Sequence, residues 1–471
     1  MGAEMGKGQD VRDATPRPGA RRATAARRVT AVVASALCAV LVASISPAAS
    51  VDNPVAPGST PPTSPAVAVL SPTPIAGSPA VAPTATGIQK AVTPLLKSST
   101  LGQFSAVVID PATENVLLDV RAGRPRIPAS TAKLLTASAA LSVLDPSERI
   151  ATVVLVKDAT LTIVGGGDST LARKEIPGVD AASLADLADQ VEAKVAANAV
   201  ELWYDDSLFS GPELGPGWPS SFPIDGVVAP VTSLMVDQGR VRPGASSRVE
   251  DPARQAAQVL AGLLKKRGLT VTSIFNRKAP EGSTEVARVE SPTIRDLVER
   301  MLTDSENDLA EALAHLVGGR LTGKASFATG AKAVEQTAEK LGLATDGLSI
   351  VDGSGLSGRD KVPPIALAEL LVSVARQSDP ALWPIGSGLP VAGFTGTLSD
   401  RFTGGLSSAA AGYVRAKTGT LSTVVALAGT VKDVDGRVLV FAVLANDVPS
   451  LDAARETLDL FASRLAKCGC S

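Results

Sequence analysis

Histidine is nearly absent from this chain of 471 residues, which contains a single one, His315. A zinc site built from several histidines is therefore excluded, and a Ser-His-Asp triad would have to use His315. Asn307, Glu311 and His315 follow one another at steps of four, so we expect His315 to be a partly exposed helix residue rather than a catalytic base. The chain also lacks a G-x-S-x-G sequence, so the nucleophile elbow of the α/β-hydrolases is not indicated.

Cysteine is scarce as well. Of the three cysteines, Cys468 and Cys470 close the chain as CGC, where they cannot staple a large loop. Burial of apolar side chains, rather than disulfides, must therefore hold the core together. A mobile tail is a better interpretation of CGC than a redox or metal site, and we expect no metal and no cofactor.

An excess of one charge is also missing, since 45 Lys and Arg residues stand against 47 Asp and Glu. No broad basic face for nucleic acid is expected. Residues 1–28 nevertheless carry seven Lys and Arg, and residues 29–46 carry no charge. This order places the C-terminal bulk of a chain outside the cytoplasm. We expect 1–28 to be cytoplasmic, 29–46 to be either a cleaved signal peptide or a membrane anchor, and the protein to be secreted or held in the cell envelope.

The composition then divides the chain. Residues 47–87 are largely Pro, Ala, Ser, Thr and Val, with too little large apolar surface to offset the entropy of ordering, and predict a disordered linker. Order is expected from about residue 88, with strands at 105–109 and 116–120. Near the other end, strands at 423–431 and 437–446 precede an amphipathic helix at 451–465.

Strands from both ends of the chain that flank helical middle segments indicate one sheet of the α/β or α+β class. Between residues 151 and 290 the pattern changes. The short β-like runs ATVVLV, ATLTIVGGG, AVELWYDD and RVEDPA alternate there with alanine-rich helical segments at 181–197 and 253–268. We therefore expect a mixed α/β domain at 151–290, inserted into a discontinuous domain formed by 88–150 and 291–471.

The stretch ASTAKLLTASAAL places Ser130 and Lys133 three residues apart at the start of an apolar segment. Such residues are neighbours on a helix face, so the amine can reach the hydroxyl. Pro128 suits a helix start, where free N–H groups favour developing negative charge. Burial lowers the pKa of a lysine, and a neutral amine can accept the serine proton. The alternative is a chance pattern in which Lys133 extends to solvent.

Two further stretches follow in order. TDSENDL contains Ser305 and Asn307, and YVRAKTGTLST contains the K-T-G sequence that starts at Lys417. The series S-x-x-K, S-x-N and K-T-G resembles the penicillin-recognising serine enzymes, which are DD-peptidases and serine β-lactamases. About 170 residues separate the first two motifs, and an insertion of this kind resembles the class C low-molecular-mass penicillin-binding proteins. These form the D-alanyl-D-alanine carboxypeptidase/endopeptidase family, of the peptidase family S13 type.

Other stretches resemble the same family, and the resemblance spans residues 93–464. They are GGGDSTL, WYDDSLFSG, APVTSLMVD, DGSGLSGRD and LPVAGFTGTLSDRF. The resemblance implies the DD-peptidase/β-lactamase-like transpeptidase fold, an antiparallel sheet flanked by helices with a helical lobe. The chain departs from many relatives at Glu306, where they carry aspartate, but this position is variable.

The resemblance also implies a mechanism on peptidoglycan stem peptides that end in D-Ala-D-Ala. Ser130 would attack the carbonyl of the penultimate D-alanine, with Lys133 as its base. Ser305 would relay a proton to the leaving amine, and Asn307 would hold Lys133 and the substrate amide. Lys417 would keep Lys133 neutral and attract the substrate carboxylate.

The K-T-G strand would supply the remaining implied contacts. Thr418 would donate a hydrogen bond to the substrate carboxylate, and Gly419 would let the acyl chain lie close to the strand. The backbone N–H groups of Ser130 and Thr420 would form the oxyanion hole, and β-lactams would be covalent inhibitors. A structural alternative for Ser305 is the N-cap of the following helix.

Three functions stay open at this point. The first is a D-Ala-D-Ala carboxypeptidase, with or without DD-endopeptidase activity. The second is a serine β-lactamase, and the third is a non-catalytic protein that binds the cell wall. The intact motifs argue against the third.

Overall fold

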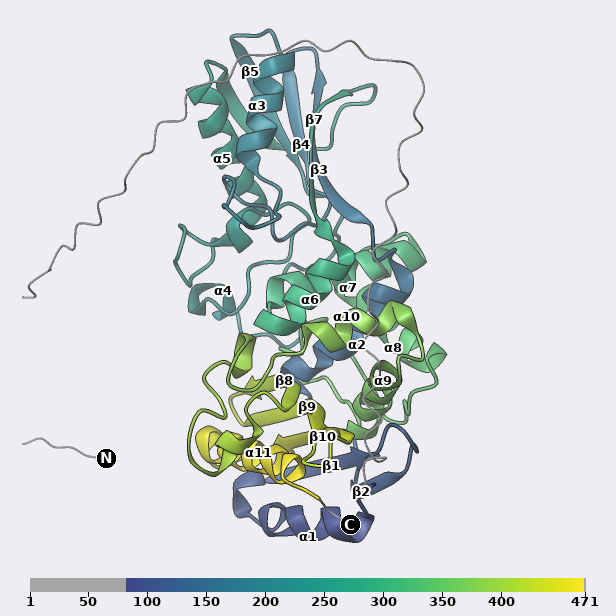
Figure 1. Ribbon diagram of the computed structural model, residues 1–471. Coiled ribbons are helices and arrows are strands. Elements are labelled where there is room, and N and C mark those ends of the chain that lie inside the picture. The colour runs from purple at the N-terminus through teal and green to yellow at the C-terminus, as the bar shows by residue number, and fades with distance from the viewer. Residues whose placement is uncertain (1–81, 470–471) are drawn as a thin grey trace, which may run out of the picture. The chain divides into compact units, whose positions relative to one another are not determined.

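The computed structural model describes residues 82–469 and contains two five-stranded sheets with helices packed against both (Figure 1). The predicted basic segment, the signal or anchor segment and most of the predicted linker lie outside the described residues. Helix α1, Ala85–Leu96, begins within the predicted linker, so that prediction is wrong for residues 85–87. Among the described helices, none has the length and apolar character needed to cross a bilayer.

The first sheet is antiparallel, in the order β2-β1-β10-β9-β8. Its strands are β1 Gln103–Ile109, β2 Val116–Val120, β8 Val414–Leu421, β9 Val424–Lys432 and β10 Val438–Asn446. Strands from the two ends of the chain lie side by side in its centre, where Gln103 pairs with Asn446 and Ile109 with Val440. The prediction of one sheet built from both ends is confirmed.

This sheet is the middle layer of three. Because side chains alternate between the faces of a strand, Val107 and Ile109 of β1 pack with the helical lobe, whereas Ala106 and Val108 pack with α1 and with α11, Leu451–Ala466. Figure 1 shows α1 and α11 on one side of the sheet and the helical lobe on the other. Burial on both faces accounts for the nearly continuous apolar sequences of β1 and β10.

The helical lobe gathers segments from the middle of the chain. It comprises α2 Lys133–Val143, α6 Ile294–Asp304, α7 Asn307–Thr322, α8 Phe327–Lys340, α9 Pro364–Arg376 and α10 Trp383–Gly388. Helix α2 is buried from Lys133 to Leu141, which explains why it is apolar all round rather than on one face. We call residues 85–143 together with 294–466 the first-sheet body.

Residues 149–293 form the second-sheet lobe, with strands in the order β6-β5-β4-β3-β7. Its elements are β3 Arg149–Lys157, β4 Thr160–Val164, α3 Leu184–Lys194, β5 Ala199–Asp205, α4 Phe222–Asp225, α5 Pro252–Lys266, β6 Thr270–Asn276 and β7 Thr284–Thr293. Strands β4, β5 and β6 are parallel, and β3 runs antiparallel to β4 and β7. The predicted mixed α/β character is confirmed.

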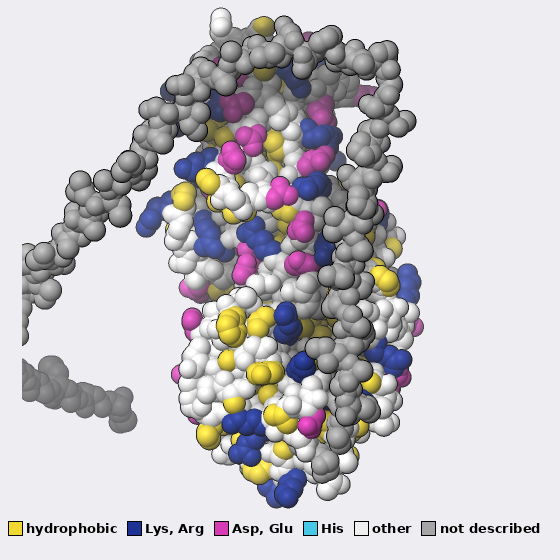
Figure 2. Space-filling view, in the orientation of Figure 1, with side chains coloured by type: hydrophobic (Ala, Val, Ile, Leu, Met, Phe, Trp, Pro, Cys, Tyr) yellow, Lys and Arg dark blue, Asp and Glu magenta, His cyan; other side chains and the backbone are white. Residues whose placement is uncertain are grey.

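Two details of the second-sheet lobe differ from the sequence interpretation. The run RVEDPA is not a strand: Arg248 forms one isolated bridge with Arg240, and α5 begins at Pro252. Strands β6 and β7 were not predicted. On the face drawn in Figure 2, Lys and Arg side chains intermingle with Asp and Glu over this lobe, and such mixing gives no focus for a polyanion.

Candidate active site

Ser130 lies in a 3₁₀ turn, Ala129–Ala132, that leads directly into α2. Ala129 has a φ of 47°, a left-handed conformation that is rare outside glycine. Two glycines make room for this turn. A Cβ on Gly355 would collide with the Ala129 carbonyl oxygen, and one on Gly419 would lie 2.8 Å from the carbonyl oxygen of Pro128. Gly419 thus seats the turn of Ser130 against β8, a reason for glycine that differs from the predicted one.

Lys133 is completely buried at the first position of α2. Its Nζ lies 3.1 Å from Ser130 Oγ, 2.8 Å from Asn307 Oδ1 and 2.7 Å from the carbonyl oxygen of Ser354. The amide and peptide oxygens accept but cannot donate, so they take two N–H groups of the amine. In the neutral amine, the lone pair is then left for the Ser130 hydroxyl, which donates to it.

The surroundings of Lys133 favour that neutral form. Burial lowers the pKa of its ammonium to about 8, although the carboxyl groups of Glu311 and Asp352 oppose the shift. The alternative in which Lys133 extends to solvent is wrong.

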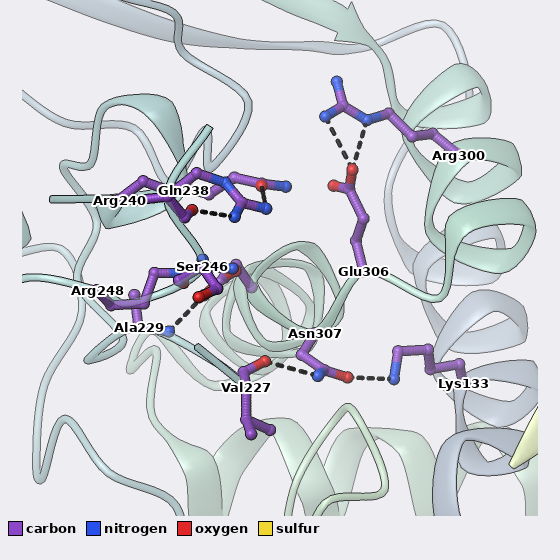
Figure 3. A network of polar contacts seen from close by, with 12 residues as sticks. Lys133, Val227, Ala229, Gln238, Arg240, Ser246, Arg248, Arg300, Glu306 and Asn307 are labelled. Atoms are coloured by element: carbon purple, nitrogen blue, oxygen red, sulfur yellow. Dashed lines mark hydrogen bonds and ion pairs between the residues drawn. The ribbon is translucent and has the colours of Figure 1, made fainter. Parts of the chain in front are cut away.

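The S-x-N motif occupies the junction between α6 and α7. Ser305 ends α6 with a φ of 59°, and Glu306 stands at the N-cap position of α7, so the N-cap interpretation of Ser305 is wrong. Asn307 begins α7 and bridges two regions, since its Oδ1 accepts from Lys133 and its Nδ2 donates to the Val227 carbonyl oxygen at 2.8 Å (Figure 3).

Lys417 of β8 is the second fully buried lysine. Its Nζ donates to Ser305 Oγ at 2.8 Å and to the Thr418 carbonyl oxygen at 3.1 Å. Burial, followed by the charge of Lys133, holds the pKa of this ammonium well below its usual range. A charge on Lys133 therefore disfavours a charge on Lys417. That Lys417 in turn keeps Lys133 neutral stays a prediction.

Within residues 82–469, β8 is an edge strand that pairs with β9 on one side. Beyond its first residues, its other side has no strand partner among these residues. The N–H of Ala416 points away from β9, because it donates to the Pro390 carbonyl oxygen. Alternate residues of a strand direct their N–H groups the same way, so those of Thr418 and Thr420 also face the open edge. Thr420 is exposed there, and the Thr418 hydroxyl lies 2.9 Å from that of Thr397.

A cavity of about 290 Å³ adjoins the S-x-N motif. Glu306 and Asn307 line one wall, and Gln238, Arg240 and Arg248 of the second-sheet lobe line the other (Figure 3). Ser305 also lines this cavity. The second-sheet lobe therefore reaches the active site through this wall and through the Val227 carbonyl oxygen.

All the side chains predicted to be catalytic meet in this site: Ser130, Lys133, Ser305, Asn307 and Lys417. His315 does not. It is 2% exposed, its ring packs between Phe209 and Phe327, and burial lowers the pKa of its imidazole to about 4. The expectation of a partly exposed histidine is wrong. Cys468 is also buried and disulfide-bonded, rather than part of a mobile tail.

Three contributors to the site were not singled out from the sequence. Ser354 supplies the carbonyl oxygen for Lys133, Thr397 the hydroxyl beside Thr418, and Val227 the carbonyl oxygen for Asn307. The first two lie within the stretches DGSGLSGRD and LPVAGFTGTLSDRF, so the resemblance marked their neighbourhoods. Val227 contributes only its backbone, for which no side-chain signal exists.

Comparisons with known proteins agree with this geometry. Residues 88–247 and 242–465 match the model of the D-Ala-D-Ala carboxypeptidase 3 (S13) family. The chain is 36% identical over 399 residues to carboxypeptidase DacB of Mycolicibacterium smegmatis, which covers 82% of this chain and 85% of that protein. It is 34% identical over 406 residues to carboxypeptidase Rv3627c of Mycobacterium tuberculosis, which covers 83% and 86%.

Among solved structures, penicillin binding protein 4 (dacB) of Haemophilus influenzae has the same fold. The TM-score is 0.68 at 21% identity, over 82% of this chain and 99% of that one, and the same protein has been solved in complex with a β-lactam. Because the family model spans most of the described residues and two relatives exceed 30% identity over most of their length, the chain belongs to the D-Ala-D-Ala carboxypeptidase 3 (S13) family of serine-type peptidases.

Proposed function

We propose that the protein removes the terminal D-alanine from peptidoglycan stem peptides that end in D-Ala-D-Ala, through an acyl-enzyme on Ser130. The observation that carries the proposal is the contact of three motifs in one polar site. Lys133 touches both Ser130 and Asn307, and Lys417 touches Ser305. Membership of the S13 family and the names of its carboxypeptidase relatives support the same reaction.

The proton path follows from these contacts. The neutral amine of Lys133 takes the hydroxyl proton as Ser130 Oγ bonds to the carbonyl carbon of the penultimate D-alanine. The N–H groups of Ser130 and Thr420 stabilise the resulting oxyanion. Ser305, held by Lys417, relays to the amine of the departing D-alanine the proton that Lys133 took from Ser130, so that Lys133 is neutral and Ser305 is a hydroxyl again. Water then hydrolyses the ester, which releases the shortened peptide and restores the Ser130 hydroxyl.

The substrate carboxylate also regulates the two lysines. We place it at Lys417 and Thr418, on the open edge of β8. Its negative charge favours the charged form of Lys417, and that charge disfavours a second one on Lys133. Substrate binding thereby raises the fraction of Lys133 that is neutral when the serine must be deprotonated.

The open edge of β8 also accommodates an extended chain, because a peptide can pair with exposed N–H groups of a strand. A cross-linked peptide could occupy the same edge, so a DD-endopeptidase activity on the same acyl-enzyme is part of the proposal. The protein would act outside the cytoplasm, attached through residues 29–46 or released after their cleavage; the charge pattern of residues 1–46 supports this location.

Two measurements test the proposal. The purified protein should release D-alanine from a pentapeptide that ends in D-Ala-D-Ala, and penicillin should add its mass to the peptide that contains Ser130. Ser130→Ala should abolish both, and a variant that stayed fully active would refute the assignment. Rapid turnover of a chromogenic β-lactam would instead indicate a β-lactamase, and wall binding without penicillin labelling a non-catalytic protein. Cleavage of isolated cross-linked dimers would establish the endopeptidase activity.

A further inference from the structure

Three buried carboxyl groups lie beneath Lys133 and take no part in the reaction proposed above. Glu311 belongs to α7, and Asp352 and Asp360 belong to the loop between α8 and α9; none is more than 1% exposed. Burial of carboxyl groups is costly unless hydrogen bonds or opposite charges compensate for it. Because the charges of these carboxyl groups act on the amine of Lys133, we infer that their unfavourable burial contributes to the function of the site.

Glu311 holds the segment that holds Lys133. Its Oε2 accepts from the N–H of Gly353 at 2.9 Å and its Oε1 from the N–H of Ser354 at 2.8 Å. The Ser354 carbonyl oxygen in turn accepts from Lys133 at 2.7 Å, and the Gly353 carbonyl oxygen accepts from the Thr136 hydroxyl at 2.6 Å. Both residues gripped by Glu311 are thus bound on their other side by α2.

Helix α7 delivers two groups to the same amine. Asn307 and Glu311 are one turn apart on one face, so Asn307 contacts Lys133 directly while Glu311 reaches it through Ser354. Gly353 allows this approach, since a Cβ there would lie 2.6 Å from the Ala310 carbonyl oxygen of α7. The loop therefore lies close enough to α7 for the Glu311 carboxylate to accept from both the Gly353 and the Ser354 N–H groups.

The charged groups around Lys133 come from three elements. Helix α7 contributes Glu311 and Asp308, the loop contributes Asp352 and Asp360, and β8 contributes Lys417. Apart from Glu311, two of these four carboxyl groups are bound to other partners, and burial disfavours the charged form of the remaining one, Asp360. Asp308 forms a buried ion pair with Arg248, Asp352 accepts N–H groups of Trp218, Gly355 and Ser357, and burial followed by Asp352 raises the pKa of Asp360 well above its usual range.

Glu311 differs from these groups. Burial, followed by the charge of Asp352, raises the pKa of its carboxyl to about 8, the same region in which Lys133 loses its proton. As the pH rises, a proton can therefore leave Glu311 as well as Lys133. An ionised Glu311 favours the ammonium form of Lys133, which cannot accept the serine proton.

We propose that Glu311 is a positioning residue for Lys133: it fixes the Ser354 carbonyl oxygen that orients the amine toward Ser130, and its charge sets the pH at which that amine becomes a base. The inference rests on the proposed function, in which Lys133 is the base of acylation. It assigns two separable effects to one side chain, an effect on the maximal rate and an effect on the pH dependence.

The experiment measures the second-order rate constant of acylation by penicillin from about pH 6 to about pH 10. In Glu311→Gln the negative charge is gone, so the acidic limb should move to lower pH by about one unit. The amide can accept only one of the two N–H groups, so the maximal rate should fall about tenfold or more. Glu311→Asp keeps the charge but reaches less far, so its maximum should fall while its limb stays within a few tenths of a pH unit of wild type.

The matched control is Glu369→Gln. Burial also raises the pKa of the Glu369 carboxyl in α9, and this carboxyl also accepts a backbone N–H, that of Ala344 at 2.6 Å. Glu369 does not contact the site. It should keep the wild-type limb and maximum. If the acidic limb of the acylation profile of Glu311→Gln lies at the wild-type pH, the proposal is overturned, whether or not the maximal rate falls. If Glu311→Gln does not fold, Glu311→Asp decides instead: an acidic limb displaced by more than a few tenths of a pH unit from wild type would contradict the proposal. Wild-type protein that penicillin does not acylate would refute the proposed function instead.

Discussion

The first-sheet body and the second-sheet lobe fill their interiors with different chemistry. Lys133 and Lys417 are among the largest fully buried side chains of the body, and the charges of four buried carboxyl groups act on Lys133. The core of the lobe is aliphatic, with residues such as Leu161 and Leu260. Its buried charged side chains, Asp168 and Arg248, lie where the lobe meets α6 and α7. The charge of Arg300 in α6 acts on the Asp168 carboxyl, and Arg248 forms an ion pair with Asp308 of α7.

The difference separates two purposes of a buried position. In the lobe, burial removes apolar surface from water and stabilises the fold. Around α2, burial removes water from amines and carboxyl groups, which destabilises their charged forms, lowers the pKa values of the amines and raises those of the carboxyl groups. Substitution of a fully buried residue should therefore change mainly the stability in the second-sheet lobe and mainly the rate of acylation around α2.

The largest effect is expected at Lys133. Lys133→Met should lower the rate of penicillin acylation by about a thousandfold or more, because the serine loses its base. Its melting temperature should stay within a few degrees of wild type, since removal of a costly buried amine offsets the loss of partners for Asn307 Oδ1 and the Ser354 carbonyl oxygen. Leu260→Met in the lobe is the control at equal depth and should acylate at the wild-type rate. Acylation kinetics and a thermal melt of both variants test the contrast.

A glycine pair gives the next largest contrast. Gly355→Ala should lower the free energy of unfolding by about 3 kcal/mol or more and abolish acylation, because a left-handed backbone and the Ala129 carbonyl oxygen both oppose the new Cβ. Gly268 follows α5 in the lobe with a φ of 90°, and an added Cβ would have no neighbouring atom within 4 Å. Gly268→Ala should therefore lower the free energy of unfolding by about 1–2 kcal/mol and leave acylation normal. Urea unfolding and penicillin labelling measure both. Equal stability losses would show that the turn of Ser130 relaxes freely.

The first sheet was predictable because its strands carry strong local signals. Continuous apolar runs bounded by turn residues mark β1, β9 and β10, and burial on both faces makes such runs necessary. In the lobe, β6 reads TVTSIFN at a sheet edge and has no fully buried residue, so neither an apolar run nor a clean alternation announces it. Edge strands of this kind are set by pairing, which a local pattern does not contain.

The site divides in the same way. Ser130, Lys133, Asn307 and Lys417 were predictable because a chemical signature fixes residue types in order along the chain. The support around them was not, since Glu311 meets Ser354 only through the packing of a loop on α7, 43 residues away. Peptide groups such as those of Val227 and Ser354 carry no residue-type signal, although they hold Asn307 and Lys133. The sequence carries the types and the order of the residues predicted to be catalytic, whereas their orientation depends on tertiary contacts.

The smallest effect is expected at His315, which lies between Phe209 of the lobe and Phe327 of the body. His315→Phe keeps a ring between these neighbours and loses the hydrogen bond of Nδ1 with the Glu311 carbonyl oxygen, 2.8 Å away. Near pH 8 the loss should be about 1 kcal/mol of unfolding free energy, with no change in the pH dependence of acylation.

The pH dependence of stability distinguishes this histidine from a catalytic one. Burial holds the pKa of His315 at about 4, below its unfolded value near 6.5, so the unfolded chain binds a proton first as the pH falls. Wild-type stability should therefore include a contribution that is complete above pH 6.5 and is lost between about pH 6.5 and pH 4, and His315→Phe should lack that loss. Urea unfolding at pH 5 and pH 8 measures it. A wild type and a variant that lose stability in parallel over this range would show that His315 is not held neutral by the junction of the two regions.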